Sequence, residues 1–165
     1  MKEKPDIVAF QETKCPTNKF PKQANLPDYE HYFSKNKRKG QHEVSIYSKE
    51  KPTRILYSSS YVESDKEAGA ITAEFDTFFL INVYAPYAGQ NLEKLPKKLA
   101  WNEAFINFTL ELDKIKPSII CGDLNVARTN LDVANPHKHI EAAGFTTKER
   151  KDTSTLLNNY FTAIY

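Results

Sequence analysis

The feature that most constrains the fold is an amphipathic helix that lies between two apolar strands. Over Leu99–Lys116, apolar side chains recur at steps of three and four residues, which gathers them on one helical face, at Trp101, Ala104, Phe105, Phe108, Leu112 and Ile115. Pro117 ends this pattern, because proline lacks the amide proton that a helix needs. Apolar runs at 78–84 and 118–121 flank the helix. The order strand, helix, strand therefore predicts a layered α/β fold with the helix covering one face of a sheet.

Short strands dominate the rest of the pattern. Segments 6–10 and 44–47 are brief apolar runs, and 119–121 is predicted as a buried strand that Gly122 ends. Residues 70–76 alternate, with Ile71, Ala73 and Phe75 on one face, and the turn at 76–77 joins them to the strand at 78–84 as a β-hairpin. The stretch 135–151 is predicted as a loop with a short helix.

Composition bounds the class of protein. The chain has 165 residues with 40% hydrophobic and 27% charged residues, which fits one globular domain rather than a disordered segment. Its formal net charge of +2 is too small to indicate a nucleic-acid partner by itself. Cys15 and Cys121 are expected to be free thiols in a reducing compartment. No segment reaches the roughly 18 apolar residues of a membrane span, so no membrane partner is expected.

Polar side chains stand where three of the predicted strands end. Glu12 follows the first strand, Tyr84 ends the hairpin, and Asp123 and Asn125 follow the strand after the helix. If these ends converge, Glu12 could hold a hard cation such as Mg²⁺, while Asp123 and Asn125 could orient or deprotonate a water. The structural alternative stays open at this point: a strand-end glutamate is often solvated, Gly-Asp-x-Asn often forms a turn, and a tyrosine there often packs.

Two lysine-rich stretches offer a further choice of interpretation. One contains Lys35, Lys37, Arg38 and Lys39, and the other contains Lys94, Lys97 and Lys98. A charge run of this kind is ordinarily a solvated face. Contact with nucleic acid is the functional alternative.

Five stretches, in this order, resemble the exonuclease III and apurinic/apyrimidinic (AP) endonuclease family of the endonuclease/exonuclease/phosphatase superfamily. They are PDIVAFQETKC, AEFDTFFLINVYAPYAG, KLAWNEAF, CGDLNVARTNLDVANP and AGFTTKER, and they extend from Pro5 to about Arg150. The resemblance implies a four-layer α/β sandwich, two facing sheets with helices outside. It also implies Mg²⁺-dependent cleavage (Mn²⁺ as a substitute) 5′ to abasic sites in double-stranded DNA during base excision repair.

The resemblance assigns roles by position. Glu12 matches the metal-binding glutamate, Asp123 and Asn125 match the pair that handles the attacking water and contributes to the metal site, and Tyr84 matches the tyrosine that supports the scissile phosphate. We expect DNA contacts from Lys14, Lys39, Gln90 and Lys94. Gln90 stands in a loop where relatives commonly place asparagine and arginine, which weakens its grip on phosphate. A nuclear protein is expected, with mitochondrial or cytoplasmic residence as alternatives.

The sequence also departs from the family pattern. The first strand with its asparagine is absent before Pro5, and no Ser-Asp-His motif precedes the last residue, Tyr165. We therefore expect one incomplete domain over residues 1–165, lacking the first strand and the C-terminal half. We also expect an exposed apolar sheet face that a partner chain could cover. Little or no incision is expected from this chain alone.

Two functions of different classes follow. The first is a DNA repair nuclease that keeps Glu12, Tyr84, Asp123 and Asn125 as site residues. The second is a non-catalytic module, derived from such an enzyme, that binds nucleic acid or another partner through its basic surface.

Overall fold

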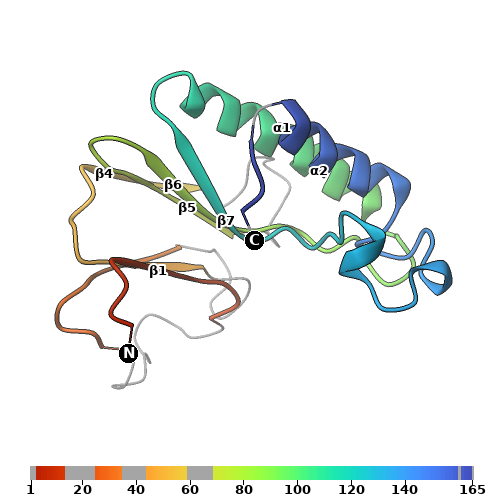
Figure 1. Ribbon diagram of the computed structural model, residues 1–165, viewed down its shortest axis with the longest axis horizontal. Helices are drawn as coiled ribbons and strands as arrows, with labels where there is room; N and C mark the ends of the chain where they lie inside the picture. The colour runs from red at the N-terminus through yellow and green to blue at the C-terminus, as the bar shows by residue number, and fades with distance from the viewer. Residues whose placement is uncertain (1–2, 14–24, 35–43, 59–68, 160, 165) are drawn as a thin grey trace.

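The computed structural model describes residues 3–13, 25–34, 44–58, 69–159 and 161–164, and all statements below refer to these. Two sheets lie face to face, and two helices cover the outer face of the larger sheet (Figure 1). The smaller sheet has the order β1-β3-β2 and the larger has the order β4-β5-β6-β7. The strands are β1 (Ile7–Phe10), β2 (Glu30–Phe33), β3 (Ser45–Ser48), β4 (Arg54–Ser58), β5 (Gly69–Glu74), β6 (Phe79–Tyr84) and β7 (Ser118–Asp123).

The helices and connections complete the predicted order. Helix α1 (Leu95–Asp113) joins β6 to β7, and helix α2 (Thr147–Asn159) packs beside it. Two 3₁₀ turns, η3 (Asn130–Asp132) and η4 (Pro136–Lys138), lie between β7 and α2. Strands β5 and β6 form the predicted antiparallel hairpin, whereas β6 and β7 are parallel because a helix connects them. The layered α/β prediction is confirmed.

Two apolar clusters hold the layers together. Strand residues of β6 and the aromatic face of α1 form the first, in which the rings of Trp101 and Phe105 stack at 5.1 Å. The second lies between the sheets and joins Val44 and Ile46 to Ile71, Ala73, Phe75, Leu80 and Tyr84. Strands β5 and β6 of the larger sheet contribute one face to each cluster, because successive side chains of a strand point to opposite faces.

The inter-sheet cluster corrects one expectation. We predicted an uncovered apolar face on the first sheet, but the smaller sheet of the same chain covers most of that face. The exception is β7, the last strand of the described sheet, where Ile119 is 51% exposed. Residues 119–121 were predicted to be buried, and Ile119 is not, because no described strand lies beyond β7. An uncovered apolar surface that a partner chain could cover is therefore found only at the β7 edge of the described sheet.

The helix bounds also differ from the prediction. Helix α1 begins at Leu95 rather than Leu99, because Pro96 lies in the first turn, where a missing amide proton costs nothing. It ends at Asp113, so Ile115 falls beyond it and is 67% exposed instead of contributing to the apolar face. None of the described helices combines the length and the apolar character that a membrane crossing would require.

Candidate active site

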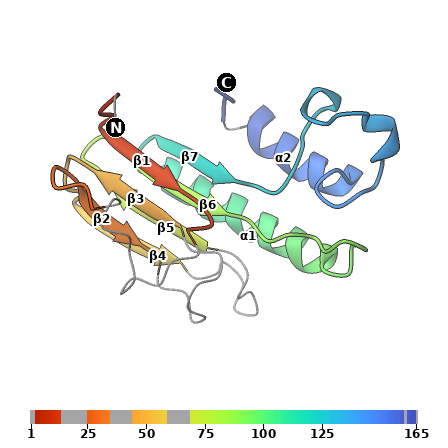
Figure 2. The same cartoon turned by 90° about the horizontal axis from the view of Figure 1, so that it is seen from below.

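Strand alternation and sheet register bring the strand ends together. Leu80, Asn82 and Tyr84 of β6 face the smaller sheet, and the parallel register sets Tyr84 beside Asp123 of β7. Strand β1 of the smaller sheet lies opposite this edge of the larger sheet and contacts β7 (Figure 2). The hydroxyl of Tyr84 donates a hydrogen bond of 2.5 Å to Oε1 of Glu12, just past the end of β1. The predicted convergence of Glu12, Tyr84 and Asp123 is therefore present in the structure.

A buried amide fixes the distance between the sheets beside this contact. Asn82 is fully buried, and its Nδ2 donates to the backbone oxygens of Phe10 and Ser45, both at 3.0 Å. Its Oδ1 accepts a hydrogen bond of 2.6 Å from Nε2 of Gln11. Since Gln11 precedes Glu12, this cross-sheet clamp places the Glu12 backbone. Asn82 was not predicted as a site residue, although its position two residues before Tyr84 puts it on the same strand face.

Asp123 and Asn125 form a compact turn at the end of β7. The Oδ1 of Asp123 accepts a 2.8 Å hydrogen bond from the backbone N–H of Asn125, and Nδ2 of Asn125 donates to the carbonyl of Ala85 at 2.8 Å. Asp123 and Asn125 thus form the turn that the sequence suggested, and the same turn lies beside Tyr84, where a site was predicted. The Asp123 side chain is exposed while Asn125 is half-buried, so the acid faces solvent and the amide is held against β6.

Two of these residues adopt left-handed backbone conformations. Glu12 has φ of 50° and Asn125 also has φ of 50°, whereas Gly122 just before Asp123 has φ of 134°. Asparagine accepts such angles readily, but a glutamate in this region costs free energy. Backbone strain of this kind is common at functional sites, where surrounding contacts hold it in place.

The electrostatics of Tyr84 keep it protonated. Burial and the hydrogen bond to Glu12 raise the pKa of Tyr84 to about 12, and the nearby Asp123 charge acts in the same direction. A side-chain hydrogen bond with Asn125 opposes this shift. Tyr84 is therefore a hydrogen-bond donor, not a base, throughout the neutral range.

This shift predicts a loss of stability at high pH. Because the folded pKa lies above the ordinary tyrosine value of 10.0, the stabilisation is complete below pH 10 and is lost as pH rises to about 12. The unfolding free-energy difference between wild type and Tyr84→Phe should be constant from pH 7 to 9 and change between pH 10 and 12. Absorbance titration checks the midpoint, and Glu12→Gln should lower it. An ordinary Tyr84 midpoint near 10 would contradict the geometry.

The donor set fits a hard divalent cation held by few protein ligands. Within the described ranges, no group of three or more His, Cys, Asp and Glu side chains could hold a metal together. The site instead offers the carboxylates of Glu12 and Asp123 with the amide of Asn125. Mg²⁺ is commonly held by one or two carboxylates while it keeps waters for a phosphate substrate. These residues would hold such an ion, and it would supply positive charge for a phosphoryl oxygen and an activated water.

The predicted DNA contacts are only partly visible. Lys14 and Lys39, like the whole cluster from Lys35 to Lys39, lie outside the described residues, as does Cys15. Gln90 is exposed in the connection between β6 and α1, and Lys94 is the half-buried N-cap residue of α1.

Cys121 is a free thiol, and burial raises its pKa to about 11.

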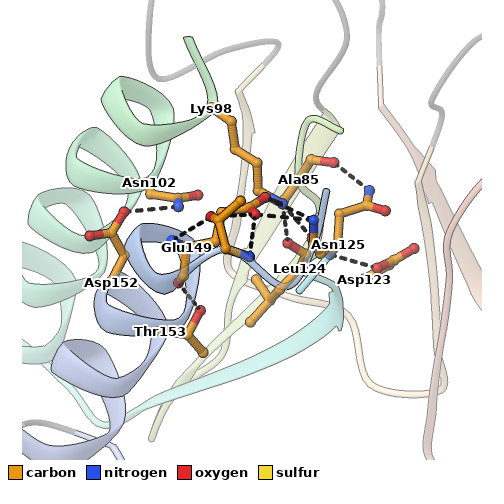
Figure 3. Close-up of polar contacts among 11 residues, drawn as sticks. Ala85, Lys98, Asn102, Asp123, Leu124, Asn125, Glu149, Asp152 and Thr153 are labelled. Carbon is orange, nitrogen blue, oxygen red and sulfur yellow. Dashed lines mark hydrogen bonds and ion pairs between the residues drawn. The ribbon is translucent and has the colours of Figure 1, made fainter. Parts of the chain in front are cut away.

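The interpretation of Lys98 as part of a solvated face is wrong. Its side chain is 1% exposed, and its Nζ lies 3.0 Å from Oε1 of Glu149, which is completely buried (Figure 3). A signal was present in the sequence, because Lys98 precedes Trp101 by three positions and so lies on the apolar face of the helix. Glu149 was missed as well. It stands three residues after Thr146, the spacing of a capping box.

The endonuclease/exonuclease/phosphatase family matches residues 2–164, so the chain belongs to that family. It is 38% identical over 164 residues to a DNA repair nuclease, APEX1, of Danio rerio and 36% identical over 156 residues to an exodeoxyribonuclease of Bacillus subtilis. An AP endonuclease from Archaeoglobus fulgidus has a similar structure, with a TM-score of 0.82 and 30% identity. By name, these three proteins are a DNA repair nuclease, an exodeoxyribonuclease and an AP endonuclease.

The match covers only part of each relative. The alignments include 98% and 94% of this chain but 53% and 61% of the Danio rerio and Bacillus subtilis proteins. The structural match covers 95% of this chain and 61% of the archaeal one. The chain thus spans a little over half the length of these relatives. Its fold is part of the four-layer sandwich that the resemblance implied.

Proposed function

We propose that this chain forms part of a DNA repair nuclease that cleaves phosphodiester bonds 5′ to abasic sites in double-stranded DNA, with Mg²⁺ as the cofactor. The observation that carries the proposal is the Tyr84–Glu12 hydrogen bond, which joins the ends of β1 and β6 beside the Asp123–Asn125 turn. Family membership supports a hydrolase, and the names of the relatives support DNA repair.

Each residue has a role that its environment supports. The carboxylate of Glu12 is exposed and would ligate the ion, with its position set by the Tyr84 hydroxyl and the Asn82 clamp. Tyr84 keeps its one proton, which it donates to Glu12 here and would turn to a phosphate oxygen when substrate is present. Asp123 is exposed, so it can orient a water and accept its proton, while Asn125 holds the turn that aims Asp123. Positioned donors and a cation together stabilise the charge of the transition state.

The second candidate is a non-catalytic DNA-binding module. In the described part of the chain the site has two carboxylates and no cluster of three metal-binding side chains, and each acid, base or phosphate-binding group that a nuclease lacks costs roughly 10²- to 10⁴-fold in rate. Binding that rests on lysine contacts with phosphates should weaken as salt is added. The two candidates therefore differ in turnover, not in affinity.

Single-turnover incision separates them. The chain, in excess over an end-labelled abasic duplex, should produce slow Mg²⁺-dependent cleavage that Glu12→Gln and Asp123→Asn each reduce at least tenfold. Asp76→Asn, an exposed turn residue at the far end of the hairpin, is the control and should not affect the rate. Binding without any cleavage would favour the non-catalytic module. Cleavage that persists in Glu12→Gln or in chelator would contradict the assigned site.

A further inference from the structure

The ammonium group of Lys98 contacts the backbone of the Asp123–Asn125 turn. Besides Glu149, its Nζ donates to the carbonyl oxygen of Leu124 at 3.4 Å and makes a short hydrogen bond to the carbonyl oxygen of Asn125. The three N–H donors of a lysine thus have three acceptors. Figure 3 shows the side chain extending from α1 to this turn. Two of the acceptors belong to the residues that follow Asp123.

Glu149 ties the same point to helix α2. Its carboxylate accepts hydrogen bonds from the backbone N–H of Gly144 at 3.0 Å and from Oγ1 of Thr146 at 2.7 Å, while Oγ1 of Thr146 accepts one from the Glu149 N–H at 3.2 Å. Gly144 lies close to the Asn125 carbonyl, since a Cβ added to this glycine would be 3.2 Å from that oxygen. The carbonyl of Asn125 is therefore held by the Lys98 ammonium from α1, and Glu149 ties that ammonium to the first turn of α2.

Stability alone is a weak reason for this arrangement. Burying two charges is costly, and an apolar pair of similar volume is often as stable or more stable. The side chains of Lys98 and Glu149 are 1% and 0% exposed, so both charges are held at the cost of their lost hydration. What the ammonium adds, and an apolar pair would not, is a donor for the carbonyls of a turn whose Asn125 has φ of 50°.

We propose that Lys98 is a positioning residue, which fixes the Asp123–Asn125 turn through its two backbone carbonyls, and that Glu149 aims the ammonium group. The proposal deepens the function proposed above, on which its metal-binding readout rests. Lys98 does not touch the substrate or the ion. Its effect passes through Asn125, whose backbone N–H donates to the Asp123 carboxylate and whose side-chain Nδ2 donates to the carbonyl oxygen of Ala85.

Four variants separate positioning from support of the fold. Lys98→Met removes the donors but leaves Glu149 buried and unpaired, so it should be unstable. The double variant Lys98→Met with Glu149→Gln removes both charges and should recover much of the unfolding free energy. Lys98→Arg keeps charge and donors. Lys114→Met is the matched control, because Lys114 follows the same helix with its side chain 68% exposed.

Two readouts are local to the turn: hydrogen exchange of the Asn125 N–H, compared with the core amide of Ile81, and Mn²⁺ affinity measured by calorimetry. In the double variant we expect exchange at Asn125 to be at least tenfold faster while Ile81 is unchanged, and Mn²⁺ binding to weaken by a similar factor. In Lys98→Arg the exchange rate at Asn125 and the Mn²⁺ affinity should both stay close to the wild-type values. In Lys114→Met neither quantity should change.

The outcomes decide between the proposals. If the double variant regains stability together with wild-type Asn125 exchange, the role of Lys98 is structural and the proposal is overturned. Unchanged Mn²⁺ affinity in a double variant whose wild-type parent binds Mn²⁺ would also overturn it. If the wild type binds no Mn²⁺ but Asn125 exchange responds as expected, the positioning role stands and the proposed metal site fails.

Discussion

Replacing Gly122 by alanine is expected to lower the free energy of unfolding by about 4 kcal/mol and to disrupt the pairing of β6 with β7. A Cβ at this position would lie 1.9 Å from the backbone oxygen of Val83 and 2.8 Å from its nitrogen. These are backbone atoms of the neighbouring strand, so they cannot rotate away. The φ of 134° adds strain for any residue with a side chain. Denaturant unfolding of the purified chain measures the loss.

Gly89→Ala is the matched control for this prediction. Gly89 also has a positive φ, of 85°, but its added Cβ would meet only the flexible carboxylate of Glu93. Gly89→Ala should therefore lower the free energy of unfolding only by the cost of a positive φ, about 1 to 2 kcal/mol. Equal losses in the two variants would show that the close approach of β7 to β6 does not exist as described.

Replacing Glu149 by alanine should cost about 4 kcal/mol, because it leaves the Lys98 charge buried without its partner and removes a helix cap. The exposed fraction of the side chain is 1% for Lys98 and 0% for Glu149. Glu111→Ala breaks an ion pair of 2.6 Å with Lys114 whose side chains are 70% and 68% exposed, and it should cost less than about 1 kcal/mol. Thermal and urea unfolding compare the two.

The pH dependence of Glu149→Ala gives an independent check. Glu149 raises the pKa of Lys98 against the larger effect of burial, so its removal should lower that pKa further. A lysine whose folded pKa is depressed binds fewer protons when folded, and stability then rises with pH up to the ordinary value of 10.5. The difference in unfolding free energy between wild type and Glu149→Ala should therefore become smaller from pH 7 to pH 10. A difference that does not change with pH would mean that Lys98 is not the charge that the substitution leaves unpaired.

Local patterns predicted much of the fold. The alternation at 70–76 placed Ile71 and Ala73 on one strand face, which is the inter-sheet face in the structure, and the order strand, helix, strand predicted that α1 covers one face of a sheet. Glu12, Tyr84 and Asp123 meet because each ends or follows a strand, and strand ends are visible in a sequence. Their roles as metal ligand, donor and water-positioning acid stay predictions until ion binding is measured.

The residues that were missed depend on tertiary packing. Lys98 looked like part of a charge run, and only the position of Glu149 and the turn explains why it is buried. Asn82 appeared as one polar residue in an apolar strand, and its partners Phe10 and Ser45 come from the other sheet. Periodicity identifies the face of such a residue, but not the group across the core that satisfies it.

The most direct test of the central claim is an NMR titration of the chain with substoichiometric Mn²⁺, which broadens amide signals near the bound ion. The convergent strand ends predict selective broadening at Glu12, Ala85 and the Asp123–Asn125 turn together, all of it lost in Glu12→Gln. Broadening at only one of these segments, or a pattern that is unchanged in Glu12→Gln, would show that the three ends do not form one cation site.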